Sequence, residues 1–199
     1  MMKLYATERS HFARKVRLLL DHLEADYEMV DVGVVTNLTP EHFRKNPLMT
    51  IPVLEDEDVW LVESDHINRY IARKLDPSDR FRTLSEAPDH LNMRAVLNGI
   101  MSNEVKIVMS SRLEPVPDAS GYLDKAKASI LTSLGWIDDR QHLFDAETPG
   151  DLEFHFVAMW DHLEKFGAIE MPDLSLSSLA NTLMAQPTIA KSACLPRVG

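Results

Sequence analysis

Residues Asn46 to Ile71 read NPLMTIPVLEDEDVWLVESDHINRYI and hold the clearest structural signals in the chain. Pro52 stands at the head of an apolar strand, where a proline cannot donate a hydrogen bond to a neighbouring strand. A second apolar strand over residues 59–62 follows an acidic turn, and a helix with Ser64 as its N-cap is expected next. The segment therefore predicts a β-hairpin, led by a proline, that runs directly into an amphipathic helix.

The residues before this segment predict a strand–helix–strand unit. Residues 3–6 are typical of a short strand, and from Phe12 onward apolar residues recur at helical spacing. Residues 27–32 alternate as a second strand, and a short helix with Thr39 as its N-cap is expected over 39–47. A crossover through a helix makes the first two strands parallel, whereas a hairpin adds antiparallel strands. We expect the order β-α-β-α-β-β-α and a mixed sheet.

Beyond residue 76 the strand signals stop. Helical periodicity covers residues 88–113 and 121–144, with a proline-containing break at 114–117 between them. A helix start of the capping-box type is expected at Thr148, and a last helix over 174–185. The chain therefore predicts an α/β domain at residues 1–76, a linker at 77–84 and an all-helical domain at 85–199.

This arrangement resembles the soluble glutathione S-transferases, in particular serine-type and bacterial-like members. The motifs that carry the resemblance are the proline-led hairpin, the Glu63-Ser64 helix start and the segment TERSHFARKVRLLL at residues 7–20. The resemblance implies a thioredoxin-like glutathione-binding domain followed by an all-helical domain. It also implies glutathione as the co-substrate, conjugation of its sulfur to a small hydrophobic electrophile, and a homodimer.

Two elements of the hairpin segment would bind glutathione if the resemblance holds. In thioredoxin-like proteins the proline at the position of Pro52 is cis, and the backbone of the preceding residue, here Ile51, pairs with the cysteinyl unit of glutathione. The amide-rich helix start would hold the γ-glutamyl carboxylate through Ser64, with Glu63 near the ammonium group of the ligand. Each motif also has a purely structural interpretation, since a proline can begin an ordinary edge strand and a serine can simply cap a helix.

Ser10 stands at the position of the activating residue in the serine- and cysteine-type classes. Its hydroxyl would donate a hydrogen bond to the glutathione sulfur and favour the thiolate, which is the nucleophilic form. Because serine forms no mixed disulfide, it favours transferase or peroxidase-like chemistry over thiol transfer. Two alternatives stay open: Ser10 as a structural N-cap, and Tyr5 as the activating hydroxyl. Tyr5 is expected to face the other side of the sheet.

Several positions depart from the pattern of the family. Met49 stands where glycine is usual, and Thr50 stands where a longer lysine or glutamine often reaches the glycyl end of glutathione. Thr50 remains a candidate contact, with His42 or Lys45 as possible substitutes for the longer side chain. The candidate wall of the acceptor pocket consists of His11, Phe12, Met101, Val105 and Val108, although His11 equally suits a solvent-facing position.

Composition narrows the range of partners. The chain has 199 residues and a formal net charge of −10, which argues against a nucleic-acid surface. Its single cysteine, Cys194, excludes a disulfide within the chain and suits the cytoplasm. No apolar run reaches the ~18 residues of a membrane span, and histidine and acidic residues show no metal-ligand spacing, so no membrane and no metal are predicted. The following basic residues are interpreted as the solvated face of a helix: Arg9, Arg14, Lys15 and Arg17.

Two other functions share these features. A non-catalytic binding or regulatory protein would keep the fold, and the departures at Met49 and Thr50 favour this alternative. The joint presence of Ser10, Pro52 and Ser64 counts against it. A glutathione-dependent disulfide reductase or peroxidase would share the glutathione site and differ in the acceptor. The transferase is the favoured hypothesis.

Overall fold

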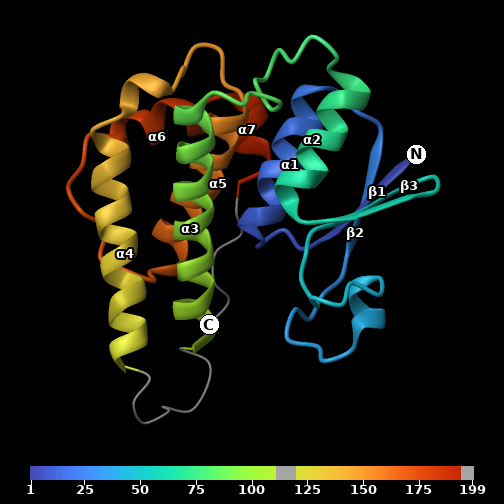
Figure 1. Ribbon diagram of the computed structural model, residues 1–199, viewed down its shortest axis with the longest axis horizontal. Coiled ribbons are helices and arrows are strands. Elements are labelled where there is room, and N and C mark those ends of the chain that lie inside the picture. The colour runs from blue at the N-terminus through green and yellow to red at the C-terminus, as the bar shows by residue number, and fades with distance from the viewer. Residues whose placement is uncertain (111–119, 194–199) are drawn as a thin grey trace.

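A computed structural model describes residues 1–110 and 120–193 of the chain. It consists of an α/β half that contains a four-stranded sheet and a second half built from helices (Figure 1). Both halves contribute to one hydrophobic core. This architecture confirms the predicted fold class, a thioredoxin-like domain followed by an all-helical domain.

The sheet has the strand order β2-β1-β3-β4. Strand β1 (Met2–Ala6) is parallel to β2 (Tyr27–Asp31) and antiparallel to β3 (Val53–Asp56), which pairs in turn with β4 (Val59–Val62). The sheet is therefore mixed, as the sequence predicts. The helices α1 (His11–His22) and α2 (Ser64–Leu75) cover one face of the sheet (Figure 1). Alternate residues of β1 point from that face into the hydrophobic core.

The second helix expected in this half is shorter than predicted. Residues Pro40–Phe43 form a single 3₁₀ turn, η1, and no side-chain hydrogen bond caps it at Thr39. Arg44 and Lys45 then adopt left-handed backbone angles, with φ of 54° and 63°. Because a right-handed helix cannot continue through such residues, the turn ends there.

Helix α1 is buried on two sides. Apolar residues such as Val16 and Leu20 contribute to the core with the sheet, and the helix also packs against α5. Arg14 and Lys15 are only 1% exposed, so their interpretation as part of a solvated face is wrong, whereas Arg9 is exposed. Acidic side chains from other helices make the burial of Arg14 and Lys15 possible, because a buried charge needs a partner of opposite charge.

The second half consists of helices throughout its described residues. The long helices α3 (Pro88–Ser110) and α4 (Ser120–Asp138) lie side by side, and a 3₁₀ turn η2 follows them (Figure 1). The predicted break at 114–117 and Cys194 lie outside the described residues. In the part of the chain that is described, no helix is both long and apolar enough to cross a membrane. The remaining bounds are η2 (Gln141–Leu143), α5 (Asp151–Phe166), α6 (Leu176–Met184) and α7 (Pro187–Lys191).

Helix α5 occupies the centre of this half and is buried on nearly all sides. Its N-cap is Gly150 and not Thr148, so the predicted capping box is displaced by two residues. Glu153 reaches back and accepts hydrogen bonds from the backbone N–H groups of Gly150 and Asp145, both at 2.7 Å. Glycine is required at the cap because a Cβ atom there would lie 2.5 Å from the carbonyl oxygen of Phe81.

Candidate functional site

The strand register brings three sequence motifs to one edge of the sheet. Tyr5 near the end of β1 pairs with Val53 at the start of β3, and Val53 pairs with Val62 at the end of β4. Neighbouring strands lie about 4.8 Å apart. Three segments therefore lie at the same edge of the sheet, beside three adjacent strands. They are the loop from β1 to Ser10, the Ile51–Pro52 bond just before β3, and the Glu63-Ser64 helix start just after β4.

The Ile51–Pro52 peptide bond is cis, which confirms the expectation from the sequence. Ile51 is half-buried, and within the described residues no hydrogen bond joins its backbone N–H or C=O. The buried side chain of Asn46 shapes the loop before it, because it accepts from the Leu48 N–H (3.0 Å) and donates to the Thr50 carbonyl (2.9 Å). The backbone of Ile51 thus lies at the sheet edge, and its two polar groups have no hydrogen-bond partner among the described residues. Thr50 itself is exposed beside it.

At the start of α2, Glu63 is the N-cap, so the prediction of Ser64 in that role is wrong. The Glu63 carboxylate accepts from the backbone N–H groups of Asp65 (3.0 Å) and His66 (3.1 Å). Ser64 is the first helical residue; it is buried, and its hydroxyl donates to Glu63 at 3.3 Å. Glu63 has a φ of 73°, a conformation that a residue with a side chain rarely adopts. Such backbone strain is concentrated at functional sites in proteins.

Ser10 is the N-cap of α1, and its side-chain oxygen accepts a hydrogen bond from the Ala13 N–H at 3.1 Å. A hydroxyl that accepts one hydrogen bond still has its own hydrogen to donate. The structural role of Ser10 is therefore compatible with a hydrogen bond from Ser10 to a sulfur atom.

The Tyr5 hydroxyl is engaged elsewhere. It donates to the Glu55 carboxylate at 2.8 Å, and the Arg44 guanidinium lies 4.8 Å from the centre of the Tyr5 ring. Burial and the neighbouring Glu55 raise the pKa of Tyr5. This arrangement agrees with the expectation that Tyr5 faces away from the helix that begins after Ser10.

A buried ionic network lies directly behind the start of α2. The Lys15 ammonium contacts the Asp65 carboxylate and donates to Asn98 Oδ1 (3.1 Å) and His155 Nε2 (3.3 Å). Asn98 in turn donates to Asp65 at 2.6 Å. Burial alone would raise the pKa of Asp65, but Lys15 and the hydrogen-bond donors outweigh it and lower the pKa to about 2. Burial and the charge of Lys15 lower the pKa of His155 to about 3, so this histidine is neutral.

The candidate acceptor wall lies mostly inside the protein. Met101 and Val108 are buried, whereas Phe12 and Val105 are partly buried. His11 is only 2% exposed, so the alternative of a solvent-facing histidine is wrong. Burial and the neighbouring His162 lower the pKa of His11 well below its ordinary value.

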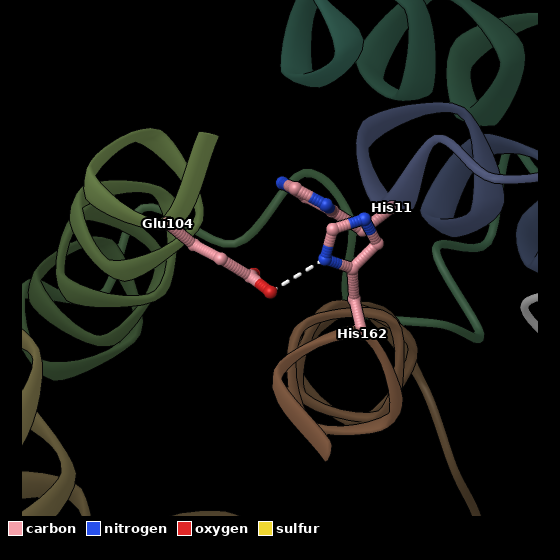
Figure 2. Close-up of side chains that lie close together, drawn as sticks. All are labelled: His11, Glu104 and His162. Atoms are coloured by element: carbon pink, nitrogen blue, oxygen red, sulfur yellow. Dashed lines mark hydrogen bonds and ion pairs between the residues drawn. The ribbon is translucent and has the colours of Figure 1, made fainter. Parts of the chain in front are cut away.

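Two buried polar residues beside His11 were missed by sequence reasoning. Glu104 on α3 and His162 on α5 point toward each other, with His162 Nδ1 2.5 Å from Glu104 Oε1 (Figure 2). Burial raises the pKa of Glu104, although His162 opposes this effect. Glu104 lies three residues after Met101 and four before Val108, on the apolar face of the helix. That spacing alone would have identified it as a buried acid.

Two shallow hollows lie at the other end of α1. They share Asp21, Ala25 and Lys191 in their linings, and none of the candidate glutathione or acceptor residues lines them. The chemistry of the sheet edge, and not these hollows, therefore defines the candidate site.

Comparison with known proteins supports the family assignment. Residues 1–73 match the family described as the glutathione S-transferase N-terminal domain. A probable glutathione S-transferase of Oryza sativa subsp. japonica is 37% identical over 75 residues, which make up 37% of this chain and 34% of the rice protein. Glutathione S-transferase 1 of Dianthus caryophyllus is 31% identical over 139 residues, or 68% of this chain and 58% of that protein. The chain thus spans between about a third and three fifths of these relatives.

The whole described fold has close structural counterparts. A glutathione S-transferase of Methylobacterium radiotolerans, in complex with glutathione sulfonate, superposes with a TM-score of 0.79 at 20% identity, covering 99% of this chain and 96% of that one. A glutathione transferase family member of Pseudomonas fluorescens Pf-5, with bound S-(propanoic acid)-glutathione, has a TM-score of 0.80 at 18% identity and covers 99% and 100%. At such identities the likeness establishes the fold, while the N-terminal match establishes kinship. Residues 1–73 therefore belong to the glutathione S-transferase N-terminal domain family, and the described chain as a whole has the fold of the soluble glutathione S-transferases.

Proposed function

We propose that this protein is a serine-type glutathione S-transferase that conjugates glutathione to a small apolar electrophile. The observation that carries the proposal is the strand register, which sets Ser10, Ile51 and the Glu63-Ser64 helix start at one edge of the sheet. The glutathione derivatives bound by the two structural counterparts support the choice of ligand.

Glutathione would lie extended along this edge. Its cysteinyl unit would pair with the unengaged N–H and C=O of Ile51, in the manner of an added strand. Its γ-glutamyl carboxylate would bind at the N-terminus of α2, where Ser64 offers a backbone N–H and a hydroxyl. Because the Glu63 carboxylate now holds that hydroxyl, binding moves Glu63 toward the ligand ammonium group. Thr50 would contact the glycyl end of glutathione.

Ser10 would then donate its free hydroxyl hydrogen to the sulfur. A free cysteine thiol has a pKa near ~8.5, and lowering this by two units takes about 2.7 kcal/mol of preference for the anion. A hydrogen bond to a charged group contributes about 1.5–3 kcal/mol. Ser10, together with the amides at the start of α1, is thus sufficient to hold a thiolate near neutral pH.

The acceptor would bind beside the thiolate, near the side chains of Phe12, Met101, Val105 and Val108. Conjugation of this kind is a detoxification reaction, and its chemistry requires glutathione but no metal. We take residues 1–76 as the glutathione-binding domain, 77–84 as the linker and 85–199 as the helical domain. The low cysteine content and the kinship with the family favour a cytoplasmic homodimer.

The test compares three proteins: wild type, Ser10→Ala and Ser10→Thr. Threonine keeps both the N-cap and the hydroxyl, so it controls for the loss of helix stability that alanine brings, about 1 kcal/mol. Turnover with an activated aryl halide, retention on immobilised glutathione and the ultraviolet absorbance of the bound thiolate are measured. Ser10→Ala is expected to lose about 10- to 150-fold in turnover and to raise the thiol pKa, while retention persists.

Three results would overturn the proposal. Unchanged turnover in Ser10→Ala would assign activation of the sulfur to another residue. Wild-type protein that neither binds immobilised glutathione nor turns over any electrophile would favour the non-catalytic alternative. Activity restricted to mixed disulfides or hydroperoxides would favour the reductase or peroxidase.

A further inference from the structure

Three side chains of the type that ligates metals meet inside the protein. His11 at the start of α1, Glu104 on α3 and His162 on α5 approach one another so that one nitrogen or oxygen from each lies within 4.8 Å of the others (Figure 2). Their exposed fractions are 2%, 0% and 6%. They are far apart in the sequence, which is why the spacing of histidines and acids did not reveal them. None of them is among the proposed glutathione contacts.

The polar atoms of this cluster are incompletely satisfied. His162 and Glu104 share one hydrogen bond, but the second oxygen of Glu104 has no hydrogen-bond partner, and the His11 ring has only an interaction with the Met101 backbone that falls short of hydrogen-bond geometry. This oxygen and the two ring nitrogens of His11 are among seven such buried side-chain atoms found in the described residues. Each unmet buried polar atom destabilises a protein by about 1–3 kcal/mol. A metal ion that binds one His11 nitrogen and the second Glu104 oxygen would remove part of this cost.

We propose that His11, Glu104 and His162 bind one divalent transition-metal ion of the zinc class. Two imidazoles and a carboxylate are donors that Zn²⁺ accepts in proteins. The unpartnered second oxygen of Glu104 supplies a fourth donor if the carboxylate binds in a bidentate manner. The proposal extends beyond the transferase function and does not depend on it.

The geometry is close to what an ion needs. Zinc lies about 2.0–2.2 Å from nitrogen and oxygen ligands in a tetrahedral arrangement, so two donors of one ion lie roughly 3.4 Å apart. From separations of up to 4.8 Å, side-chain movements that together amount to roughly 1.4 Å bring the donors into range. The ion would take the place of the hydrogen between His162 and Glu104. Glu104 offsets part of its charge, and the nearby Lys15 is already paired with Asp65.

The surroundings hold the ligand rings in place. The His162 ring stacks on Phe166 with centres 3.9 Å apart and an angle of 6° between the planes, and it meets the His11 ring edge-on at 4.1 Å. A ligand that is oriented in advance loses less freedom on binding. Because α1 belongs to the first half of the chain and α3 and α5 to the second, the ion would join the two halves directly beside Ser10.

The first experiment uses the full chain, stripped with a chelator and then dialysed against Zn²⁺ or Co²⁺ alone. Elemental analysis is expected to give one ion per chain, and Co²⁺ should produce the intense visible absorption of a four-coordinate site. The melting temperature should rise with the Zn²⁺ concentration, as it does for any ligand that binds only the folded state. Substoichiometric binding, or a cobalt spectrum like that of the hydrated ion, would overturn the proposal and leave a water-filled polar cluster.

Variants then locate the ion. His11→Gln, Glu104→Gln and His162→Gln should each weaken Zn²⁺ binding by about tenfold or more, since each removes one donor. The matched control is His22→Gln, which changes a half-buried histidine of the same helix whose ring contacts the Leu18 carbonyl. Equal loss of binding in the control, or full binding in the three variants, would contradict the assignment. The cobalt spectrum of the wild type decides the question even if a variant fails to fold.

Discussion

Replacing Asp65 with asparagine would remove the carboxylate that neutralises a fully buried lysine. Lys15 is 1% exposed, and its ammonium group contacts Asp65, Asn98 and His155. The folded protein lowers the pKa of Asp65 from 3.8 to about 2. A difference of roughly 1.8 units corresponds to about 2.4 kcal/mol of stability, at about 1.36 kcal/mol per unit. Removing one member of a buried ion pair destabilises a protein by about 3–5 kcal/mol, so we expect a loss of about 2.5–5 kcal/mol at pH 7.

The Lys15–Asp65 ion pair also predicts how the stability of the protein depends on pH. Because the pKa of Asp65 is lower in the folded than in the unfolded protein, its stabilisation is complete above about pH 4 and disappears as the pH falls toward 2. Asp65→Asn should lack this part of the acid dependence. His155, whose pKa is lowered from 6.5 to about 3, adds a separate loss that begins below about pH 6.5, because the unfolded chain binds the proton first.

Urea denaturation followed by circular dichroism between pH 7 and pH 2 measures both effects. Lys15→Met and the double variant Lys15→Met/Asp65→Asn complete a double-mutant cycle. The double variant should be more stable than Asp65→Asn, because it no longer buries an uncompensated ammonium group. An Asp65→Asn protein within about 0.5 kcal/mol of wild type at pH 7 would refute the reasoning, since that is the size of an ordinary surface substitution. So would a double variant no more stable than the single one.

Three further substitutions follow from the structure. Ser64→Ala should weaken glutathione binding by about 1–3 kcal/mol, measured by calorimetry, because a polar partner of the ligand is lost; unchanged affinity would move the γ-glutamyl contact elsewhere. Met49→Gly should stabilise the protein by about 0.5–1 kcal/mol, since Met49 has a φ of 50° that glycine adopts freely, and Met49→Ala should give no such gain. Gly150→Ala should destabilise it by about 1–3 kcal/mol through the clash with the Phe81 carbonyl, whereas Gly99→Ala, which meets open space within α3, should not.

The elements of the fold could be predicted because their signals are local. The alternation of β2, the helical spacing from Phe12 onward and the proline before β3 each appear within a few residues. These signals also fix the order of elements, and the order implies a mixed sheet. The register that gathers Ser10, Ile51 and Ser64 follows from the same order, which is why their convergence could be expected before the structure was known.

The errors concern interactions between distant residues. Lys15 looks like a solvated residue until Asp65 and His155 are placed beside it, and the same is true of Arg14 and Asp161. Helix caps failed for a different reason: the cap at Glu63 depends on a backbone angle that its residue type does not favour. The cap at Gly150 depends on the close approach of the Phe81 backbone, which leaves no space for a Cβ atom. Neither property is written in the local sequence.

The burial of Arg14 and Lys15 limits how the two parts of the chain can be exchanged between related proteins. The match to the N-terminal domain family ends at residue 73, yet the partners of these two cations include Asn98, His155 and Asp161 beyond it. A chimera that joined this amino-terminal portion to the carboxy-terminal portion of another family member would remove the Asp161 counter-charge of Arg14 and two hydrogen-bond partners of Lys15, which would keep Asp65, unless the same residues were present there. We therefore expect such an exchange to yield a stable protein only when these partners are transferred with the cations they contact.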